Sequence, residues 1–226
     1  MRNDGTDYCA KGVMTTKREA LSQFHRGQIL TAAKALFAEK SVEGTSMDDI
    51  SAKADYSKST VYVYFSGKED ILYNIVLDDM KRLGDGIRAC LEEHAGFEER
   101  YFAICNLLVE LAASDPTFLE LVLGKISVDE ADFVRLPVLK QIYDIGEETN
   151  LLIGRMFHEA VESGFADASV DPTAAGMVFW SSICGLISVS ANKEAYFQKN
   201  LELSRQAFLQ YGFELLLNSV RKKENA

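Results

Sequence analysis

The nine residues 57–65 bring together side chains that could recognise a polyanion. They read Ser-Lys-Ser-Thr-Val-Tyr-Val-Tyr-Phe, and none of them is a carboxylate. In a helix, Val61 and Phe65 stand one turn apart and could anchor the segment to a core. The side chains left for the outward faces carry hydroxyls and one ammonium group: Lys58, Ser59, Thr60, Tyr62 and Tyr64. Donors without negative charge are what a phosphate-lined groove requires.

A second short helix is expected just before this segment. Thr45 and Ser46 precede Asp49, and a hydroxyl followed three residues later by a carboxylate is typical of a helix start. This helix should end at a turn around Asp55, after which Ser57 can cap the next helix. Two short helices joined by a tight turn indicate a helix-turn-helix. Two short helices joined by a turn are frequent in all-α proteins, and a helix rich in Ser, Thr and Tyr is often only a polar surface. The residue types alone therefore leave both interpretations open.

The elements that must position this segment are also helical. No segment shows sustained strand alternation, and apolar residues recur every three or four positions over 20–39, the expected first helix. A long helix should begin within 66–70 and carry Ile71, Leu72 and Ile75. Further helices are expected over 97–114, from 115–116, over 137–163, over 172–192 and over 195–220. The sequence predicts an all-α protein of about nine helices, an N-terminal three-helix helix-turn-helix domain followed by a helical bundle.

Charge separates the same two parts. The 226-residue chain has a formal net charge of −10, which argues against a protein that coats nucleic acid with its whole surface. Residues 15–68, however, hold eight Lys and Arg against six Asp and Glu, whereas residues 69–226 hold 14 against 26. A mildly basic piece on an acidic body allows polyanion binding at one end only. We expect a flexible arm at 1–19, a helix-turn-helix domain at 20–67 and a bundle domain at 68–226.

Residues 27–75 resemble the N-terminal domain of TetR-family transcriptional regulators. The matching residues keep a fixed order in three groups: Ile29, Leu30, Ala32, Ala33, Leu36 and Phe37, then Thr45, Ser46, Met47 and Ile50, then Ser57, Thr60, Tyr62, Tyr64, Phe65, Lys68, Glu69 and Leu72. So many matches over about 49 residues make the resemblance specific. The rest of the chain matches only in its helical layout.

The resemblance implies particular DNA contacts. Thr45 and Ser46 fall at the phosphate-contacting start of the bracing helix, where helix-end N–H groups favour an anion. The base-reading contacts fall on Lys58, Ser59 and Thr60, the aromatic contacts on Tyr62 and Tyr64, and the backbone-gripping lysine on Lys68. Charge alone suggests further contacts from Lys17, Arg18 and Arg26.

Two residues depart from the family pattern. The family usually has Gly after the first helix and favours Gly in the turn between the two short helices, whereas this chain has Ser41 and Asp55. Asp tolerates a left-handed backbone better than most residues, at a cost of roughly 1–2 kcal/mol. We expect an altered turn and an intact motif.

The resemblance also implies that the larger domain dimerises and binds a small molecule. The last two helices carry apolar stripes and small residues, as a four-helix dimer interface needs, and two reading heads would recognise a palindromic operator. We expect a pocket between the helices at 97–114 and 137–163, lined by Tyr101, Cys105, Leu108, Ile142, Tyr143, Thr149, Ile153 and Met156, with Phe179 and Trp180. Such a set favours an apolar or aromatic effector.

The sequence has no motif typical of a metal site, a cofactor site or a catalytic site. His25, His94 and His158 have no ligand-like spacing, the four cysteines form no CxxC pair, and no phosphate loop or nucleophile motif occurs, so we expect no metal, no cofactor and no enzyme activity. No apolar run reaches the ~20 residues of a membrane helix and the N-terminus has no signal-peptide core, which favours a reduced, cytoplasmic protein away from membranes. The expected function is a homodimeric, effector-released repressor. The alternatives are a helical small-molecule-binding protein without DNA binding, and a helical enzyme or lipid carrier.

Overall fold

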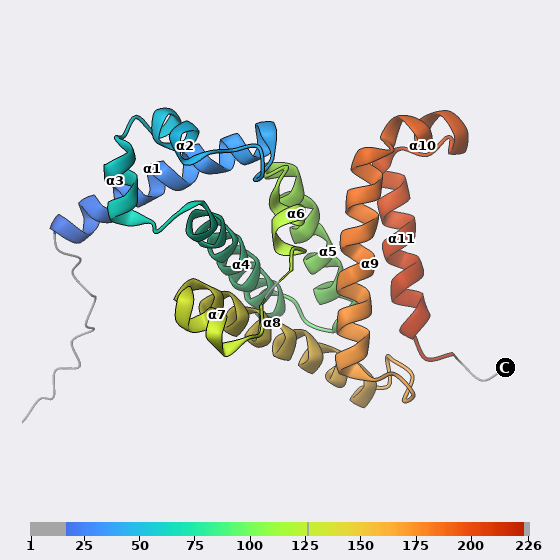
Figure 1. Ribbon diagram of the computed structural model, residues 1–226. Coiled ribbons are helices and arrows are strands. Elements are labelled where there is room, and N and C mark those ends of the chain that lie inside the picture. The colour runs from blue at the N-terminus through green and yellow to red at the C-terminus, as the bar shows by residue number, and fades with distance from the viewer. Residues whose placement is uncertain (1–16, 126, 224–226) are drawn as a thin grey trace, which may run out of the picture. The chain divides into compact units, whose positions relative to one another are not determined.

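The computed structural model describes residues 17–125 and 127–223 and divides the chain into two compact units, 1–67 and 68–226 (Figure 1). The described residues form eleven helices and no strand beyond an isolated bridge between Ala166 and Arg221. The all-α prediction is therefore confirmed. The predicted arm lies largely outside the described residues, and the first helix begins at Lys17, three residues before its expected start.

The N-terminal unit contains α1 (Lys17–Lys40), α2 (Met47–Ala54) and α3 (Lys58–Tyr64). Each helix contributes to one small core, which includes the buried side chains of Ile29, Ala33, Ile50, Val61 and Phe65. The apolar periodicity expected over 20–39 is confirmed from Ile29 to Phe37, whereas the apolar Phe24 is 59% exposed.

The second unit is a bundle of long helices that pack around α5 (Phe97–Ser114). Its partners α4 (Lys68–Glu93), α8 (Pro137–Glu162), α9 (Pro172–Asn192) and α11 (Arg205–Val220) all pack against α5. The Tyr101 hydroxyl donates a hydrogen bond of 3.0 Å to the Phe213 carbonyl and so ties α5 to α11. Helix α5 therefore buries one face in the bundle, whereas Glu98, Asn106 and Glu110 are exposed.

Local capping explains two differences from the expected helices. The helix expected from Asp115-Pro116 is α6 (Phe118–Val122), because the Asp115 carboxylate accepts from the Thr117 amide and hydroxyl and turns the chain first. The helix expected over 195–220 is divided into α10 (Glu194–Leu201) and α11. Glu202 is left-handed with φ 54°, and Ser204 then caps α11 by accepting from the Ala207 amide.

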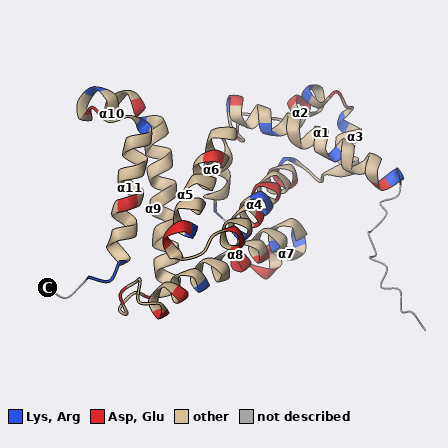
Figure 2. Cartoon of the chain, turned by 180° about the vertical axis from the view of Figure 1, so that it is seen from behind, with Lys and Arg blue, Asp and Glu red and all other residues tan. Residues whose placement is uncertain are grey.

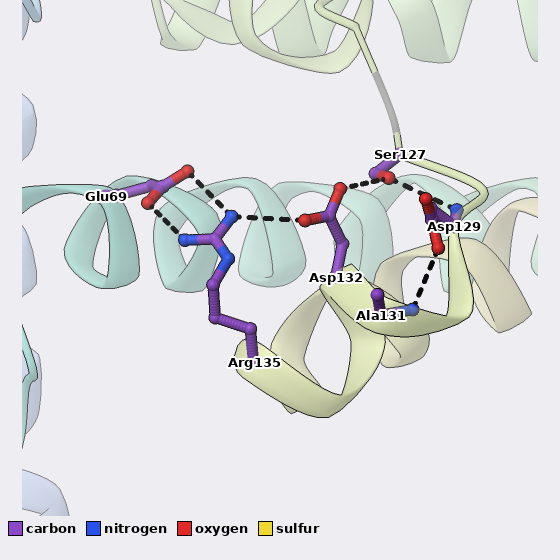
Figure 3. Close-up of polar contacts among 6 residues, drawn as sticks. All are labelled: Glu69, Ser127, Asp129, Ala131, Asp132 and Arg135. Carbon is purple, nitrogen blue, oxygen red and sulfur yellow. Dashed lines mark hydrogen bonds and ion pairs between the residues drawn. The ribbon is translucent and has the colours of Figure 1, made fainter.

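An unexpected short helix, α7 (Glu130–Arg135), is tied to the start of α4 (Figure 3). Arg135 makes a fork of two contacts to Glu69, at 2.8 and 3.4 Å, and a third to Asp132 at 3.4 Å. The hydroxyl of Ser127, then the guanidinium of Arg135, lower the pKa of the Asp132 carboxyl. Asp129 caps α7 by accepting from the Ala131 amide at 2.9 Å, a local signal that the sequence interpretation missed.

Helix α9 is long and apolar enough to cross a membrane by length and composition alone, and 33% of its most apolar stretch is buried. Uninterrupted apolar runs remain short in α9, as expected from the sequence, because its serines and glycines interrupt them without adding charge. A core helix of a soluble protein passes the same test.

Candidate nucleic-acid interface and effector cavity

The start of α2 is fixed by a capping box. The Ser46 hydroxyl accepts from the Asp49 amide at 3.2 Å, and the Asp49 carboxylate accepts from the Ser46 amide at 2.8 Å. Hydrogen bonds from the Ser46 hydroxyl, followed by Lys40, hold the pKa of Asp49 well below its usual range. The predicted helix start is confirmed, and Ser46 is exposed there.

Thr45, in contrast, faces inward. Its side chain is only 2% exposed, and its hydroxyl donates to the Ser41 carbonyl at 2.8 Å. Thr45 thus closes the turn between α1 and α2, and its hydroxyl does not lie on the outer surface where a phosphate contact was expected.

The two positions that depart from the family pattern both adopt the conformation that glycine favours. Ser41 has φ 64° and Asp55 has φ 59°. The Asp55 amide still bonds to the Ala52 carbonyl at 3.3 Å, and the Tyr56 amide bonds to the Ser51 carbonyl at 3.0 Å. The prediction that the turn survives with Asp55 is confirmed.

Helix α3 begins with Ser57, whose hydroxyl accepts from the Thr60 amide at 3.0 Å. The same hydroxyl lies 2.8 Å from that of Ser59 and 2.7 Å from that of Thr60. These hydroxyls therefore form one cluster at the N-terminus of α3. A partner arriving there must exchange these bonds for its own.

The predicted division of α3 into inner and outer faces is confirmed. Val61 is fully buried and Phe65 is 1% exposed, whereas Lys58, Ser59 and Tyr62 are exposed and Thr60 and Tyr64 are half-buried. The sequence interpretation missed Val63, which is 77% exposed. Its position two residues after Val61 places it on the opposite face of the helix, so the spacing alone predicts that this side chain is exposed.

Arg26 of α1 holds α3 in place. Its guanidinium donates to the Tyr64 carbonyl at 2.9 Å and lies 4.5 Å above the centre of the Phe65 ring. A cation near the C-terminal carbonyls of a helix is favourable, as is its place over an aromatic face. His25, the preceding residue, has its Nδ1 2.6 Å from the Tyr56 hydroxyl. Arg26 and His25 thus bind the α2–α3 turn and the end of α3 to α1.

The ammonium group of α3 pairs within the unit. Lys58 Nζ lies 2.9 Å from Oδ1 and 3.1 Å from Oδ2 of Asp48, on α2. This hydrogen bond, together with the charge of Asp48, raises the pKa of Lys58. Both side chains are substantially exposed, so the pair lies at the same surface as Tyr62 and Val63. Lys68 begins α4 and belongs to the second unit, and Lys17 and Arg18 are exposed in the first turn of α1.

A cavity of about 680 Å³ lies within the second unit, between α4, α5, α8 and α9. Seven of the ten residues expected there line it: Tyr101, Leu108, Thr149, Ile153, Met156, Phe179 and Trp180. The sequence interpretation missed the wall that α4 supplies through Met80, Leu83 and Ile87.

The other three expected residues lie outside the cavity lining. Cys105 and Ile142 are buried in the packed core, and burial raises the pKa of the Cys105 thiol to about 12. Tyr143 packs against Phe133 of α7, with ring centres 5.7 Å apart. The described residues hold no group of three or more His, Cys, Asp or Glu arranged to bind a metal ion.

Comparisons with known proteins agree with this geometry. Residues 29–75 match the family model for bacterial regulatory proteins of the tetR family. The chain is 33% identical over 86 residues to the uncharacterised HTH-type transcriptional regulator YfiR of Bacillus subtilis, covering 38% of this chain and 40% of that protein. The chain spans about two fifths of the length of the first curated relatives it matches.

Solved structures extend the likeness to the second unit. FadR of Bacillus subtilis in complex with stearoyl-CoA has a TM-score of 0.66 at 19% identity, covering 86% of this chain and 99% of that one. The ketosteroid regulator KstR2 of Mycobacterium tuberculosis has a TM-score of 0.64 at 18% identity, covering 88% and 95%. These likenesses concern the fold.

The fold is thus a helix-turn-helix unit joined to a helical bundle with an apolar cavity. Within it, residues 29–75 form a domain that matches those of bacterial regulatory proteins of the tetR family.

Proposed function

We propose that this chain is a homodimeric repressor that binds a palindromic DNA operator through α3 and is released by an apolar effector. The observation that carries the proposal is the outer face of α3, where an ammonium group, hydroxyls and an exposed valine stand on a helix anchored by Val61 and Phe65. The mildly basic balance of residues 15–68 supports it.

Each exposed group of α3 has a matching partner in a major groove. Lys58, Ser59 and Thr60, at the start of α3, are proposed to read base edges, and the hydroxyls of Tyr62 and Tyr64 to contact phosphates. Val63 suits a thymine methyl group, which a major groove presents to apolar side chains. Ser46 and Lys68 are proposed as further phosphate contacts. Thr45 is proposed to hold the turn that positions Ser46, through its hydrogen bond to the Ser41 carbonyl.

The proposed dimer interface is the outer face of α9 and α11. No charged residue lies on α9, and α11 carries only Arg205 and Glu214 (Figure 2). On this face, Val178, Ser181, Gly185 and Val189 follow one another at steps of three or four residues and are exposed, as are Tyr211 and Leu215 of α11. An apolar face with small residues permits close helix packing, and a twofold pair of such faces forms a closed dimer.

The cavity is the proposed effector site. It is mostly apolar, and its volume lies in the range of small-molecule sites. FadR was solved with stearoyl-CoA and KstR2 is named for ketosteroids, which supports an apolar effector here. Because α4 lines the cavity and continues the chain directly from the N-terminal unit, a tilt of α4 would change the spacing of the two reading heads. Release requires that the effector bind the DNA-free state more tightly. A protein with these roles acts in the cytoplasm.

The test is a binding titration of the full chain on duplex DNA that flanks its own gene, at several salt concentrations. We expect binding that weakens steeply with salt, because Lys and Arg displace counterions from phosphates. Tyr62→Ala should weaken binding about tenfold or more while leaving the helical content unchanged, since Tyr62 is 48% exposed.

Tyr196→Ala is the matched control, because Tyr196 is 57% exposed on α10, outside the N-terminal unit. Wild-type affinity in Tyr62→Ala would refute the assignment of α3 as the reading helix. A chain that binds small molecules but shows no salt-dependent DNA binding would instead be a helical binding protein or lipid carrier.

A further inference from the structure

The deep part of the cavity offers a ligand no free hydrogen-bond donor. Two hydroxyls reach it, and both are committed: Tyr101 donates to the Phe213 carbonyl at 3.0 Å and Thr149 donates to the Ile145 carbonyl at 2.8 Å. The surrounding side chains are apolar, as at Leu83, Ile87 and Phe179. An anionic or other hydrogen-bond-accepting group pushed to this depth would lose its hydration without a donor in return, which is unfavourable. The ligand must therefore enter with its apolar part first.

The polar side chains of the cavity lie toward its exposed edge, on α8 and at the start of α9. Among them is Arg155, which is exposed and has no ion pair or hydrogen bond within the described residues. Every other arginine of the second unit has a polar partner: Arg82, Arg88, Arg100, Arg135, Arg205 and Arg221. Arg155 is thus the arginine of this unit whose guanidinium has no polar partner among the described residues, and it lines the cavity.

The surroundings of Arg155 also favour an anion. Gly176 of α9 packs against Ile153 of α8, since a Cβ added at Gly176 would lie 3.0 Å from the Ile153 side chain. This stretch of α8 therefore lies beside the first turns of α9, where the helix dipole is positive. Asp171 satisfies one amide there by accepting from Ala174, and the hydroxyl of Thr173 also lines the cavity.

The acidic groups of the same region are accounted for. Glu147 also lines the cavity, but it is eight residues from Arg155 along α8, about 12 Å away. Its carboxylate accepts a long hydrogen bond of 3.5 Å from Asn150. Glu162 lies 3.3 Å from His158 and pairs with that ring when it is protonated. Glu159, one turn after Arg155 on α8, is paired with Arg100 of α5 at 2.7 Å. Each of these carboxylates therefore has a partner other than Arg155.

We propose that the effector is an anionic amphiphile, with an apolar chain in the cavity and a carboxylate or phosphate held by Arg155. This inference rests on the proposed role of the cavity as the effector site and names the chemical class that it takes. Arg binds both head groups with its planar set of N–H donors, so the two share one recognition chemistry.

The test compares four probes with the same C12 chain: dodecanoate, dodecyl phosphate, 1-dodecanol and dodecylamine. Trp180 is the single tryptophan of the chain and lines the cavity, so its fluorescence reports binding directly. We expect one or both anions to bind at least fivefold more tightly than the alcohol, and the better of the two identifies the head group. Arg155→Gln should remove this advantage, about fivefold for a solvent-exposed contact, and leave the alcohol unchanged.

Lys199→Gln is the matched control, because it removes one exposed positive charge on α10 away from the cavity lining and should change nothing. Equal affinity for the anions and the alcohol, a preference for the amine, or an unchanged anion affinity in Arg155→Gln would overturn the head-group assignment while the apolar effector of the proposed function stands. If no probe alters Trp180 fluorescence, both the inference and the apolar effector fail.

Discussion

At the scale of single residues, the outer face of α3 carries hydrogen-bond donors, one of which is paired with a carboxylate. Lys58 is the ammonium group of the helix, and it is held by the Asp48 carboxylate at 2.9 Å. Exposed pairs of this kind contribute little to stability. In the proposed complex, Asp48 therefore acts mainly on binding, because it places a negative charge beside the proposed DNA-reading surface and competes with the DNA for Lys58. Such a carboxylate would weaken phosphate contacts on every DNA sequence alike, so that discrimination between sequences would depend on contacts to the bases.

Replacing this carboxylate should strengthen DNA binding. We expect Asp48→Asn to raise affinity for operator and unrelated duplexes several-fold, because the change removes a negative charge and frees Lys58 for a phosphate. The slope of log affinity against log salt should steepen by up to about one phosphate contact. Fluorescence anisotropy at several salt concentrations measures both quantities.

Asp144→Asn provides the control, since Asp144 forms a comparable exposed pair with Lys140 on α8, at 2.7 Å to Oδ2. It should leave DNA affinity unchanged. Weaker operator binding in Asp48→Asn would contradict the account and indicate that the Asp48–Lys58 pair holds the lysine in its reading position.

At the scale of elements, the helix-turn-helix depends on caps and on one left-handed turn. Ser46 and Ser57 fix the starts of α2 and α3, and Asp55 lets the chain reverse between them at φ 59°. Arg26 then holds the end of α3 to α1. The strain at Asp55 is the weak point of this arrangement, at roughly 1–2 kcal/mol for a residue with a Cβ.

Relieving that strain should stabilise the motif. We expect Asp55→Gly to add up to about 1 kcal/mol, because the released strain exceeds the entropy that glycine adds to the unfolded chain. Hydrogen exchange should then slow up to about fivefold at the amides of α2 and α3. Ala52→Gly, one turn earlier on the exposed side of α2, should have the opposite sign and cost about 0.5–1 kcal/mol. Faster exchange in Asp55→Gly would show that the aspartate side chain itself supports the turn.

The sequence predicts this unit well because its signals are local. Caps, the i to i+4 spacing of Val61 and Phe65, and the turn at Asp55 all act within a few residues. The second unit is harder to predict from the sequence. The attachment of α7 to α4 depends on Arg135 meeting Glu69, and the α4 wall of the cavity depends on which face of a long helix lines the cavity. Both are decided by packing between distant segments.

At the scale of the whole molecule, the proposed function requires two reading heads. One α3 contacts only a few base pairs, so recognition of an operator needs a twofold pair of chains. The largely apolar face of α9 and α11 is the surface proposed to form that pair, and the cavity beside α4 is proposed to control it. These parts make sense together only if the DNA site is itself symmetric.

Selection of bound sequences from random duplex DNA by the full chain tests this claim most directly. The account predicts a palindromic consensus whose half-sites lie one helical turn, about 34–36 Å, or a multiple of it apart. It also predicts that the consensus is lost when the selection is repeated with Tyr62→Ala. Failure to enrich any sequence, or enrichment of a single asymmetric site that Tyr62→Ala binds equally well, would contradict it.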